Sequence, residues 1–232
     1  MNETNAFFQA VYRHDSEFGN QSPPWDIDGP QPVFVDLANS GKISGEVLDA
    51  GFGPAGLSLY LATEGYAVTG IDQSPEAVDA ARARARQRGL RASFAVGDLL
   101  DLSEYRGRFG TVVECGVFHG LGPDERRQYA RSLHVATRPG AHAHLLNLTG
   151  SGQEAARARL AESGMSAPAV EGFHAVTAEH LRAAFAGLWD VVSIEERAMK
   201  LRFPGDQQFT ELPAVLSTFK RRPDVRCTGA AK

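Results

Sequence analysis

The sequence predicts an α/β fold: a doubly wound, Rossmann-like, mostly parallel seven-stranded sheet with helices packed on it and an N-terminal helical lid. Two observations lead to this prediction. Short apolar runs alternate with helical segments between residues 46 and 194, and strands that are joined through helices pair in parallel by right-handed crossovers. A glycine-rich turn at residues 51–56 also follows the first apolar run and opens the next helix, as expected of a βα unit.

Strands are expected at the apolar runs and helices at the segments between them. The expected strands are residues 46–50, 66–71, 92–96, 109–115, 142–148, 189–194 and 212–219. The helix after the second strand has clear start signals: Ser74 can cap it, Pro75 suits its first turn and Glu76 complements its dipole. Gly89 is the matching stop signal. Further helices are expected at residues 33–40, 57–62, 123–138 and 177–188.

The first 32 residues differ from the rest of the chain. Phe7, Phe8, Val11 and Tyr12 recur at helical spacing. The chain then enters a proline- and glycine-rich segment, residues 23–30, which favours an extended and pinned conformation. We expect residues 1–32 to form a lid segment, residues 33–222 to form the main domain, and residues 223–232 to be a disordered tail.

Composition excludes several classes of function. The net charge of −4 gives no global attraction to nucleic acid or anionic lipid. Cys115 and Cys227 are too few for a disulfide framework, and no paired Cys and His spacing suggests structural zinc. No run approaches the length of a membrane span, and the N-terminus lacks the pattern of a signal peptide. We expect a cytoplasmic protein with no nucleic-acid or membrane partner.

The glycine turn predicts an adenosine site. Gly51, Gly53 and Gly56 match the G-x-G-x-x-G spacing, and Asp72 ends the second strand. A carboxylate in that place can accept hydrogen bonds from both ribose hydroxyls. NAD and S-adenosylmethionine both contain adenosine, so the spacing alone leaves both open. Asp49, two residues before the first glycine, favours the second, because an acid there would repel a pyrophosphate but assist a cationic group.

Two further strand ends suit the same ligand. Asp98 follows the third strand, where a short polar side chain can accept a hydrogen bond from the adenine amino group. Glu114 and Cys115 end the fourth strand, beside the expected position of the sulfonium and its methyl group. The strand ends therefore favour S-adenosylmethionine over NAD.

At this point the residues resemble a known family, the class I S-adenosylmethionine-dependent methyltransferases. The likeness lies in residues 46–56, Asp72, Gly97-Asp98, residues 114–119 and Arg138-Pro139-Gly140. The segment Pro24-Trp25-Asp26-Ile27, followed by Gly29-Pro30-Gln31-Pro32, is similar to a bacterial branch related to thiopurine-type methyltransferases, which act on small phenols, quinols and thiols. The resemblance implies that residues 33–222 are a domain that binds S-adenosylmethionine.

The resemblance also implies contacts and chemistry. It implies cofactor-binding residues at the strand ends and in the N-terminal segment: Trp25, Asp49, Gly51, Phe52, Gly53, Asp72, Gln73, Asp98, Leu99, Glu114 and Cys115. It implies in-line transfer of the methyl group to an oxygen or sulfur atom of a small molecule, aromatic or thiol-bearing. No metal is expected, because Asn147 is a lone candidate ligand without nearby acids. A monomer and a homodimer both stay open.

The glycine turn departs from the pattern of the branch, which reads Gly-Cys-Gly-Thr-Gly. Here Pro54 offers no backbone N–H, and Ala55 resists the positive φ that glycine adopts easily. These residues predict a loop shifted by one position, in which Gly56 supplies the conformational freedom.

His119 is the best candidate for a general base, because it lies a few residues past the fourth strand. A phenol, with a pKa of about 10, needs a base more than a thiol does. If His119 titrates normally, phenol methylation should fall as pH drops through about 6.5. The alternative is that His119 only lines or packs the pocket. His14 and His174 are weaker candidates for the base.

Two rival functions stay open. An NAD-dependent oxidoreductase would need a catalytic Tyr-Lys or His pair, which is not apparent in the sequence. The other rival is a methyltransferase-fold protein that binds S-adenosylmethionine without methylating, or that catalyses another reaction such as a cyclisation. Pro54 and Ala55 are the residues that keep this second rival open.

Overall fold

The computed structural model describes residues 3–165 and 173–224. It confirms the predicted fold class: seven strands form one sheet in the order β3-β2-β1-β4-β5-β7-β6. The strands are β1 (Val47–Ala50), β2 (Val68–Asp72), β3 (Ala92–Val96), β4 (Phe109–Cys115), β5 (Thr137–Leu148), β6 (Trp189–Leu201) and β7 (Thr210–Arg221). Strands β1 to β5 pair in parallel, and β7 runs antiparallel between β5 and β6.

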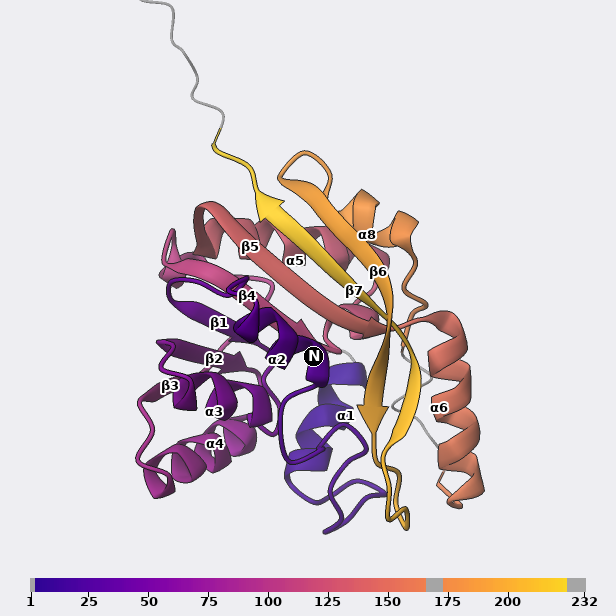
Figure 1. Cartoon of the computed structure of the whole chain (residues 1–232). Helices are drawn as coiled ribbons and strands as arrows, with labels where there is room; N and C mark the ends of the chain where they lie inside the picture. The colour runs from indigo at the N-terminus through magenta and orange to yellow at the C-terminus, as the bar shows by residue number, and fades with distance from the viewer. Residues whose placement is uncertain (1–2, 166–172, 225–232) are drawn as a thin grey trace, which may run out of the picture.

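Helices cover both faces of the sheet (Figure 1). They are α1 (Glu3–Tyr12), α2 (Pro32–Asn39), α3 (Gly56–Thr63), α4 (Pro75–Gln87), α5 (Pro123–Ala136), α6 (Gly150–Glu162) and α8 (Ala178–Phe185), with short 3₁₀ turns at Ser103–Tyr105 and Phe118–Gly120. Side chains of α2 and α6 share one apolar core, and those of α5 and α8 share another. Neighbouring residues of β4, Val112 and Val113, belong to different cores, as the period of two in a strand requires.

The predicted Ser74 cap of α4 is present, and Thr177 caps α8 in the same way. The Ser74 hydroxyl accepts a hydrogen bond from the Ala77 N–H at 3.2 Å, and the Thr177 hydroxyl accepts one from the His180 N–H at 3.2 Å. These bonds satisfy N–H groups that have no partner inside the helix. The starts of α4 and α8 were therefore readable from sequence.

Three parts of the fold differ from the prediction. Strand β5 begins at Thr137, before the predicted run at residues 142–148. Strand β6 extends to Leu201 and β7 begins at Thr210, so the hairpin is much longer than the predicted runs at residues 189–194 and 212–219. The added part of β6 is charged, and its cross-strand pairing with β7 holds it extended. Helix α6 was not predicted. It packs so closely on β7 that a Cβ on Gly152 would lie 2.1 Å from the Pro213 carbonyl oxygen.

The N-terminal segment packs into the main core. Val11 and Phe18 are buried in the same apolar cluster as α2 and the far half of the hairpin. Figure 1 shows α1 at the same end of the molecule as the tip of the β6–β7 hairpin. The predicted tail at residues 223–232 lies mostly outside the described residues.

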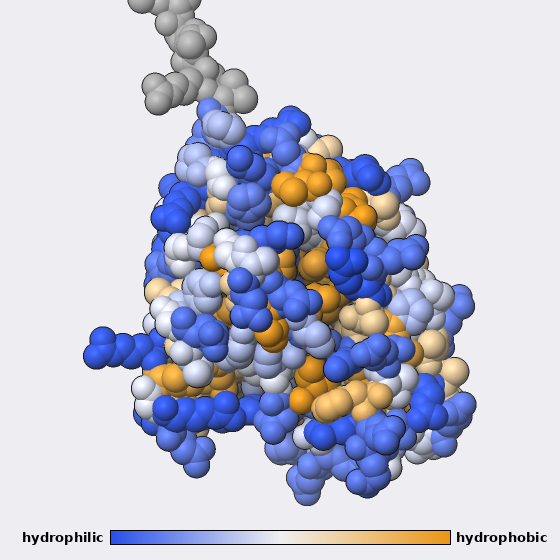
Figure 2. All heavy atoms as spheres, viewed as in Figure 1, coloured by the Kyte–Doolittle hydropathy of each residue, from blue (hydrophilic) through white to orange (hydrophobic). Residues whose placement is uncertain are grey.

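Figure 2 shows a mostly hydrophilic face, with apolar side chains visible in separate patches. Among the described helices, none has both the length and the apolar character that crossing a membrane requires.

The turn after β1 corrects the prediction for the glycine loop. Ala55 itself takes the left-handed conformation, with φ at +62°, and its methyl group is fully buried among the side chains of α4 and β3. Gly56 is the first residue of α3 and has no positive φ. It is needed for another reason: a Cβ there would lie 2.6 Å from the Gly29 carbonyl oxygen.

We predict that Gly56→Ala lowers the free energy of unfolding by about 1–3 kcal/mol, the usual effect of overpacking. The backbone of Gly29 must move to admit the new methyl group. Gly29→Ala is the matched control, because a Cβ at that position meets nothing within 4 Å and needs no positive φ. Urea unfolding of both variants measures the difference. Equal stabilities would contradict the close contact between the two segments.

Candidate functional site

A cavity of about 230 Å³ lies at the carboxyl ends of the parallel strands. The chain leaves β1 toward β2 on one side, while β4 pairs with β1 on the other side. Such a switch in strand order leaves a crevice in which ligands of open α/β sheets bind. The structure thus places the cavity where the sequence predicted an adenosine site.

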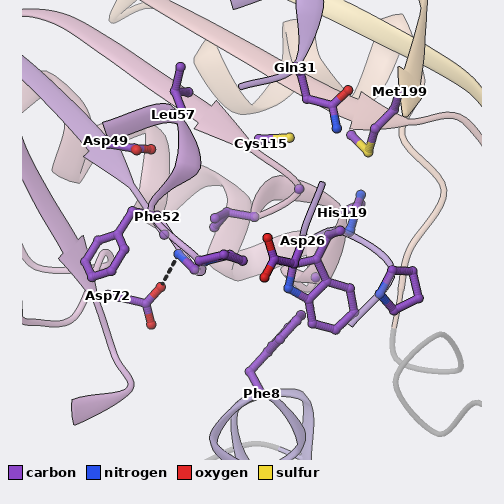
Figure 3. A pocket seen from close by; sticks show the side chains of 18 of the residues that line it. Phe8, Asp26, Gln31, Asp49, Phe52, Leu57, Asp72, Cys115, His119 and Met199 are labelled. Carbon is purple, nitrogen blue, oxygen red and sulfur yellow. Dashed lines mark hydrogen bonds between the residues drawn. The ribbon is translucent and has the colours of Figure 1, made fainter. Parts of the chain in front are cut away.

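Most of the predicted cofactor residues line this cavity together. They are Trp25, Asp49, Gly51, Phe52, Gly53, Asp72, Gln73, Asp98, Leu99 and Cys115. His119, the candidate base, lines it as well. Figure 3 shows Asp72 and Phe52 at one side of the cavity and His119 at the other. Glu114 is not among the lining residues.

Asp72 at the end of β2 is held by the backbone. Its two carboxylate oxygens accept hydrogen bonds from the N–H groups of Gly53 and Ser74, each at 3.0 Å. Burial raises the pKa of Asp72, and these N–H groups oppose that rise because they stabilise the charged form. Each oxygen keeps further acceptor capacity. The carboxylate is therefore oriented in advance and can accept hydrogen bonds from a ligand.

Asp49 lies at the base of the glycine turn. The Ser58 hydroxyl donates a hydrogen bond of 2.6 Å to its Oδ2 atom. Burial raises the pKa of Asp49 to about 7, and the nearby charge of Asp72 adds to the rise. A cation bound in the cavity would favour the ionised form of Asp49.

The glycine turn presents few free donors to a ligand. The N–H of Gly51 bonds to the Ile71 carbonyl, that of Gly53 to Asp72, and that of Ala55 to the Phe52 carbonyl. Pro54 has no N–H. A pyrophosphate site needs such N–H groups to point at the ligand. The turn is therefore better suited to a ligand without phosphate.

Glu114 is buried outside the cavity lining and stabilises the turn after β4. Its carboxylate accepts hydrogen bonds from the N–H groups of Val117 and Phe118 and from Nδ2 of Asn147. Burial raises the pKa of Glu114 to about 7. The Oδ1 atom of Asn147 in turn accepts the backbone N–H of His119 at 3.1 Å. Glu114 and Asn147 thus fix the backbone that carries His119.

His119 is a buried, uncharged imidazole. Its Nδ1 atom has no hydrogen-bond partner among the described residues, and its ring packs on Phe173 with the centroids 4.3 Å apart. Burial lowers the pKa of His119 to about 3, and the positive charge of Arg126 adds to this effect. The expected titration near 6.5 is therefore not what this environment produces.

The other predicted histidine candidates lie away from the cavity. His14 is exposed and its Nδ1 atom lies 3.0 Å from the Gly19 carbonyl oxygen. The His174 side chain is exposed as well. Among the described residues, no group of three or more His, Cys, Asp or Glu side chains could hold a metal ion.

Apolar side chains form the wall opposite the strand ends. Phe8 lies with its ring centroid 5.5 Å from Trp25 and 6.2 Å from Phe173. The rest of this wall comes from the far half of the hairpin and from the region of α6: Leu148, Ala156, Leu160, Met199, Leu201 and Phe203. Sequence analysis did not identify these six residues, because no local pattern indicates that they converge.

Backbone pairing joins the N-terminal segment to the hairpin. The Gln31 side chain donates to the Lys200 carbonyl and accepts from the Lys200 N–H, both at 2.8 Å. The Arg202 N–H bonds to the Pro24 carbonyl at 2.9 Å. Gln31 thus pairs with β6 as a neighbouring strand would. These bonds hold the N-terminal segment against the β6–β7 hairpin.

The comparisons with known proteins agree with this geometry. A family model described as a methyltransferase domain matches residues 47–140. The 2-heptyl-1-hydroxyquinolin-4(1H)-one methyltransferase of Mycobacteroides abscessus is 34% identical over 189 residues, which cover 81% of this chain and 78% of that protein.

Solved structures show the same fold. One, from work on the conversion of a disulfide bond into a thioacetal group during echinomycin biosynthesis, is 43% identical with a TM-score of 0.87, and the match covers 94% of this chain and 93% of that one. Magnesium protoporphyrin IX methyltransferase from Synechocystis, with bound SAM, is 19% identical with a TM-score of 0.58 over 82% of this chain and 76% of that one.

We predict that His119→Phe makes stability less sensitive to acid. In the wild type, the unfolded chain takes up a proton below pH 6.5 that the folded state, with a pKa of about 3, does not bind. Stability is therefore lost as pH falls from 6.5 toward 3. Between pH 6.5 and 5 the variant should lose about 2 kcal/mol less than the wild type.

Urea unfolding at the two pH values measures this difference. His174→Phe is the control, because it makes the same substitution at an exposed histidine that does not line the cavity. Identical pH dependence in both variants would show that burial does not keep His119 uncharged.

Proposed function

Because the chain belongs to the class I S-adenosylmethionine-dependent methyltransferases, we propose that it transfers the cofactor's methyl group to an oxygen or sulfur atom of a small apolar molecule. The observation that carries this proposal is the aromatic and aliphatic wall of the cavity, which faces the strand ends that would hold the cofactor. Such walls bury flat, apolar ligands well.

The residues present fit the cofactor. Asp72 offers oriented carboxylate oxygens for ribose hydroxyls, Phe52 and Leu99 supply apolar surface, and Asp49 supplies a negative charge for a cationic ligand. The donor-poor glycine turn argues against NAD. When bound, S-adenosylmethionine supplies an electrophilic methyl group on a sulfonium.

The chain's own contribution to the reaction is binding, orientation and exclusion of water. Holding two reactants in line contributes on the order of 7–11 kcal/mol to such reactions. The Phe8, Trp25 and Phe173 rings would orient a flat acceptor and shield it from water. Trp25 is itself held, because its Nε1 atom donates to the Tyr12 hydroxyl at 3.3 Å.

His119 is proposed as the residue that handles the acceptor's proton. Because its pKa is lowered to about 3, the imidazole is uncharged at neutral pH and presents an acceptor nitrogen there. Its low pKa makes it a weak base, so orientation of the acceptor O–H or S–H is the larger part of its role. Cys115 is not a nucleophile here, because burial and nearby acids raise the pKa of its thiol.

Two relatives support oxygen and sulfur as acceptor atoms. The Mycobacteroides enzyme is named for a substrate with a hydroxyl group on a flat bicyclic ring. The structure that is 43% identical concerns a reaction at a disulfide. We further propose the branch related to thiopurine-type enzymes, since Trp25 and Gln31 of its characteristic segment line the cavity. An N-terminal lid function for residues 1–32 and action in the cytoplasm belong to the same proposal.

We predict that Asp72→Asn weakens binding of S-adenosylhomocysteine roughly 10- to 100-fold. The ribose hydroxyls would no longer bond to a charged group, and hydrogen bonds to charged groups are the stronger ones. The substitution keeps the shape of the side chain but removes the carboxylate. Calorimetry measures the affinity, with Asp79→Asn on the exposed face of α4 as the control. Unchanged affinity would mean that the ribose is held elsewhere.

We predict that the enzyme methylates 2-naphthol or 2-naphthalenethiol, a pair that differs only in the acceptor atom. Labelled S-adenosylmethionine and chromatography would detect the methylated ring and S-adenosylhomocysteine. Cofactor binding without any methylated product from either compound would favour the non-methylating alternative.

The same pair tests His119. His119→Phe should slow methylation of the naphthol more than that of the thiol, because a thiol ionises more readily without help. In the wild type, the rate should show no fall at pH 6.5 that depends on His119, since its pKa is about 3. Equal loss on both acceptors would show that His119 only shapes the pocket.

A further inference from the structure

The charged side chains that line the cavity are all acidic. Among the described residues the lining contains five carboxyl groups and no lysine or arginine: Asp26, Asp49, Asp72, Asp98 and Glu125. Residues 166–172, which precede Phe173, also contain no lysine or arginine in the sequence. The described lining of the cavity thus combines carboxyl groups with apolar walls and contains no lysine or arginine.

Asp26 and Asp98 each have little described compensation for their charge: Oδ1 of Asp98 accepts one hydrogen bond, from the Leu100 N–H at 2.8 Å. Asp72 and Asp49 are held at the strand ends by N–H and O–H donors. For Asp26, the described part of the chain provides one donor only, the Asp28 N–H at 3.1 Å from Oδ1. Figure 3 shows the Asp26 carboxyl projecting into the cavity between Phe52 and His119.

The neighbouring cations are directed elsewhere. Arg84 bonds to the Pro54 carbonyl oxygen at 2.6 Å and to Asp28 at 3.2 Å. The Arg202 guanidinium lies 5.5 Å from the centre of the Phe209 ring. Arg126, behind His119, donates to backbone carbonyls, including that of His174 at 3.0 Å, and it does not line the cavity.

His119, which lines the same cavity, supplies no positive charge either. Its side chain is more than nine-tenths buried, and its Nδ1 atom has no partner among the described residues. The imidazole is uncharged, because burial lowers its pKa to about 3. It offers a ligand a hydrogen bond but no positive charge that could hold an anion.

We propose that the acceptor carries no fixed negative charge away from its reacting atom, and that Asp26 is the specificity-determining residue that excludes anionic acceptors. This inference rests on the proposed function. A carboxylate, phosphate or sulfate on the acceptor would lie among apolar side chains beside the half-buried carboxylate of Asp26. Like charges repel there more than in bulk water, because the protein around them screens less well than solvent does. Neutral or cationic ring compounds meet no such repulsion.

Methyl 6-hydroxy-2-naphthoate and 6-hydroxy-2-naphthoate test this inference. They share the ring and the reacting hydroxyl, and differ in a neutral ester against a carboxylate. Calorimetry in the presence of S-adenosylhomocysteine measures their affinities directly, and product formation gives kcat/KM. We expect the ester to bind roughly tenfold or more tightly than the carboxylate.

Two variants identify the residue responsible. Asp26→Asn should reduce the ratio of the ester's affinity to the carboxylate's affinity at least about threefold, mainly because the carboxylate binds more tightly. Asp28→Asn is the matched control: it removes a charge two residues away that is paired with Arg84 on the surface, and it should leave that ratio unchanged.

Equal affinity for the two compounds in the wild type, or tighter binding of the carboxylate, would overturn the inference while the proposed function stands. If Asp26→Asn leaves the difference in affinity between ester and carboxylate unchanged, Asp26 is not the cause of that difference. If neither compound binds and neither is methylated, the aromatic acceptor cavity itself is contradicted, and the inference falls with it.

Discussion

The close approach of the Gly29 carbonyl to Gly56 links the N-terminal segment to the sheet, and the cavity depends on it. Because no side chain separates the two backbones, the chain at Gly29 lies directly against the start of α3. Gln31 then reaches the backbone of β6 and joins the segment to the hairpin. Without these contacts the carboxyl edge of the sheet would be an open surface, as in any doubly wound protein.

The N-terminal segment, which covers the carboxyl edge of the sheet, also sets the electrostatics of the site. It removes water from the carboxyl groups at the strand ends, so burial raises the pKa values of Asp49 and Asp72. The same burial keeps His119 uncharged. A cavity with acids and no described cation favours a positively charged cofactor, and S-adenosylmethionine carries its charge on the sulfur that donates the methyl group. The apolar wall and the acidic strand ends therefore act together, because the wall binds a ligand by its shape and the acids bind it by its charge.

The parts that sequence predicted well are those controlled by local physics. The parallel strands were readable as short apolar runs, and the start of α4 from the Ser74 cap. The carboxylates of Asp49 and Asp72 could be placed because strand ends meet at one edge of a sheet. Ala55 was misjudged, since burial of its methyl group offsets the strain of a positive φ in a way that no local rule reveals. Met199, Leu201 and Phe203 were missed because they reach the site only through a hairpin whose length is set by pairing with β7.

A crystal structure with S-adenosylhomocysteine bound tests the account most directly, because it locates the sulfur relative to the apolar wall. The account predicts ribose hydroxyls on the Asp72 carboxylate and the sulfur directed toward the part of the cavity lined by Phe8, Phe173 and His119. A ligand with its adenosine away from Asp72, or with its sulfur facing bulk solvent, would contradict the claim that cofactor and acceptor meet in this cavity.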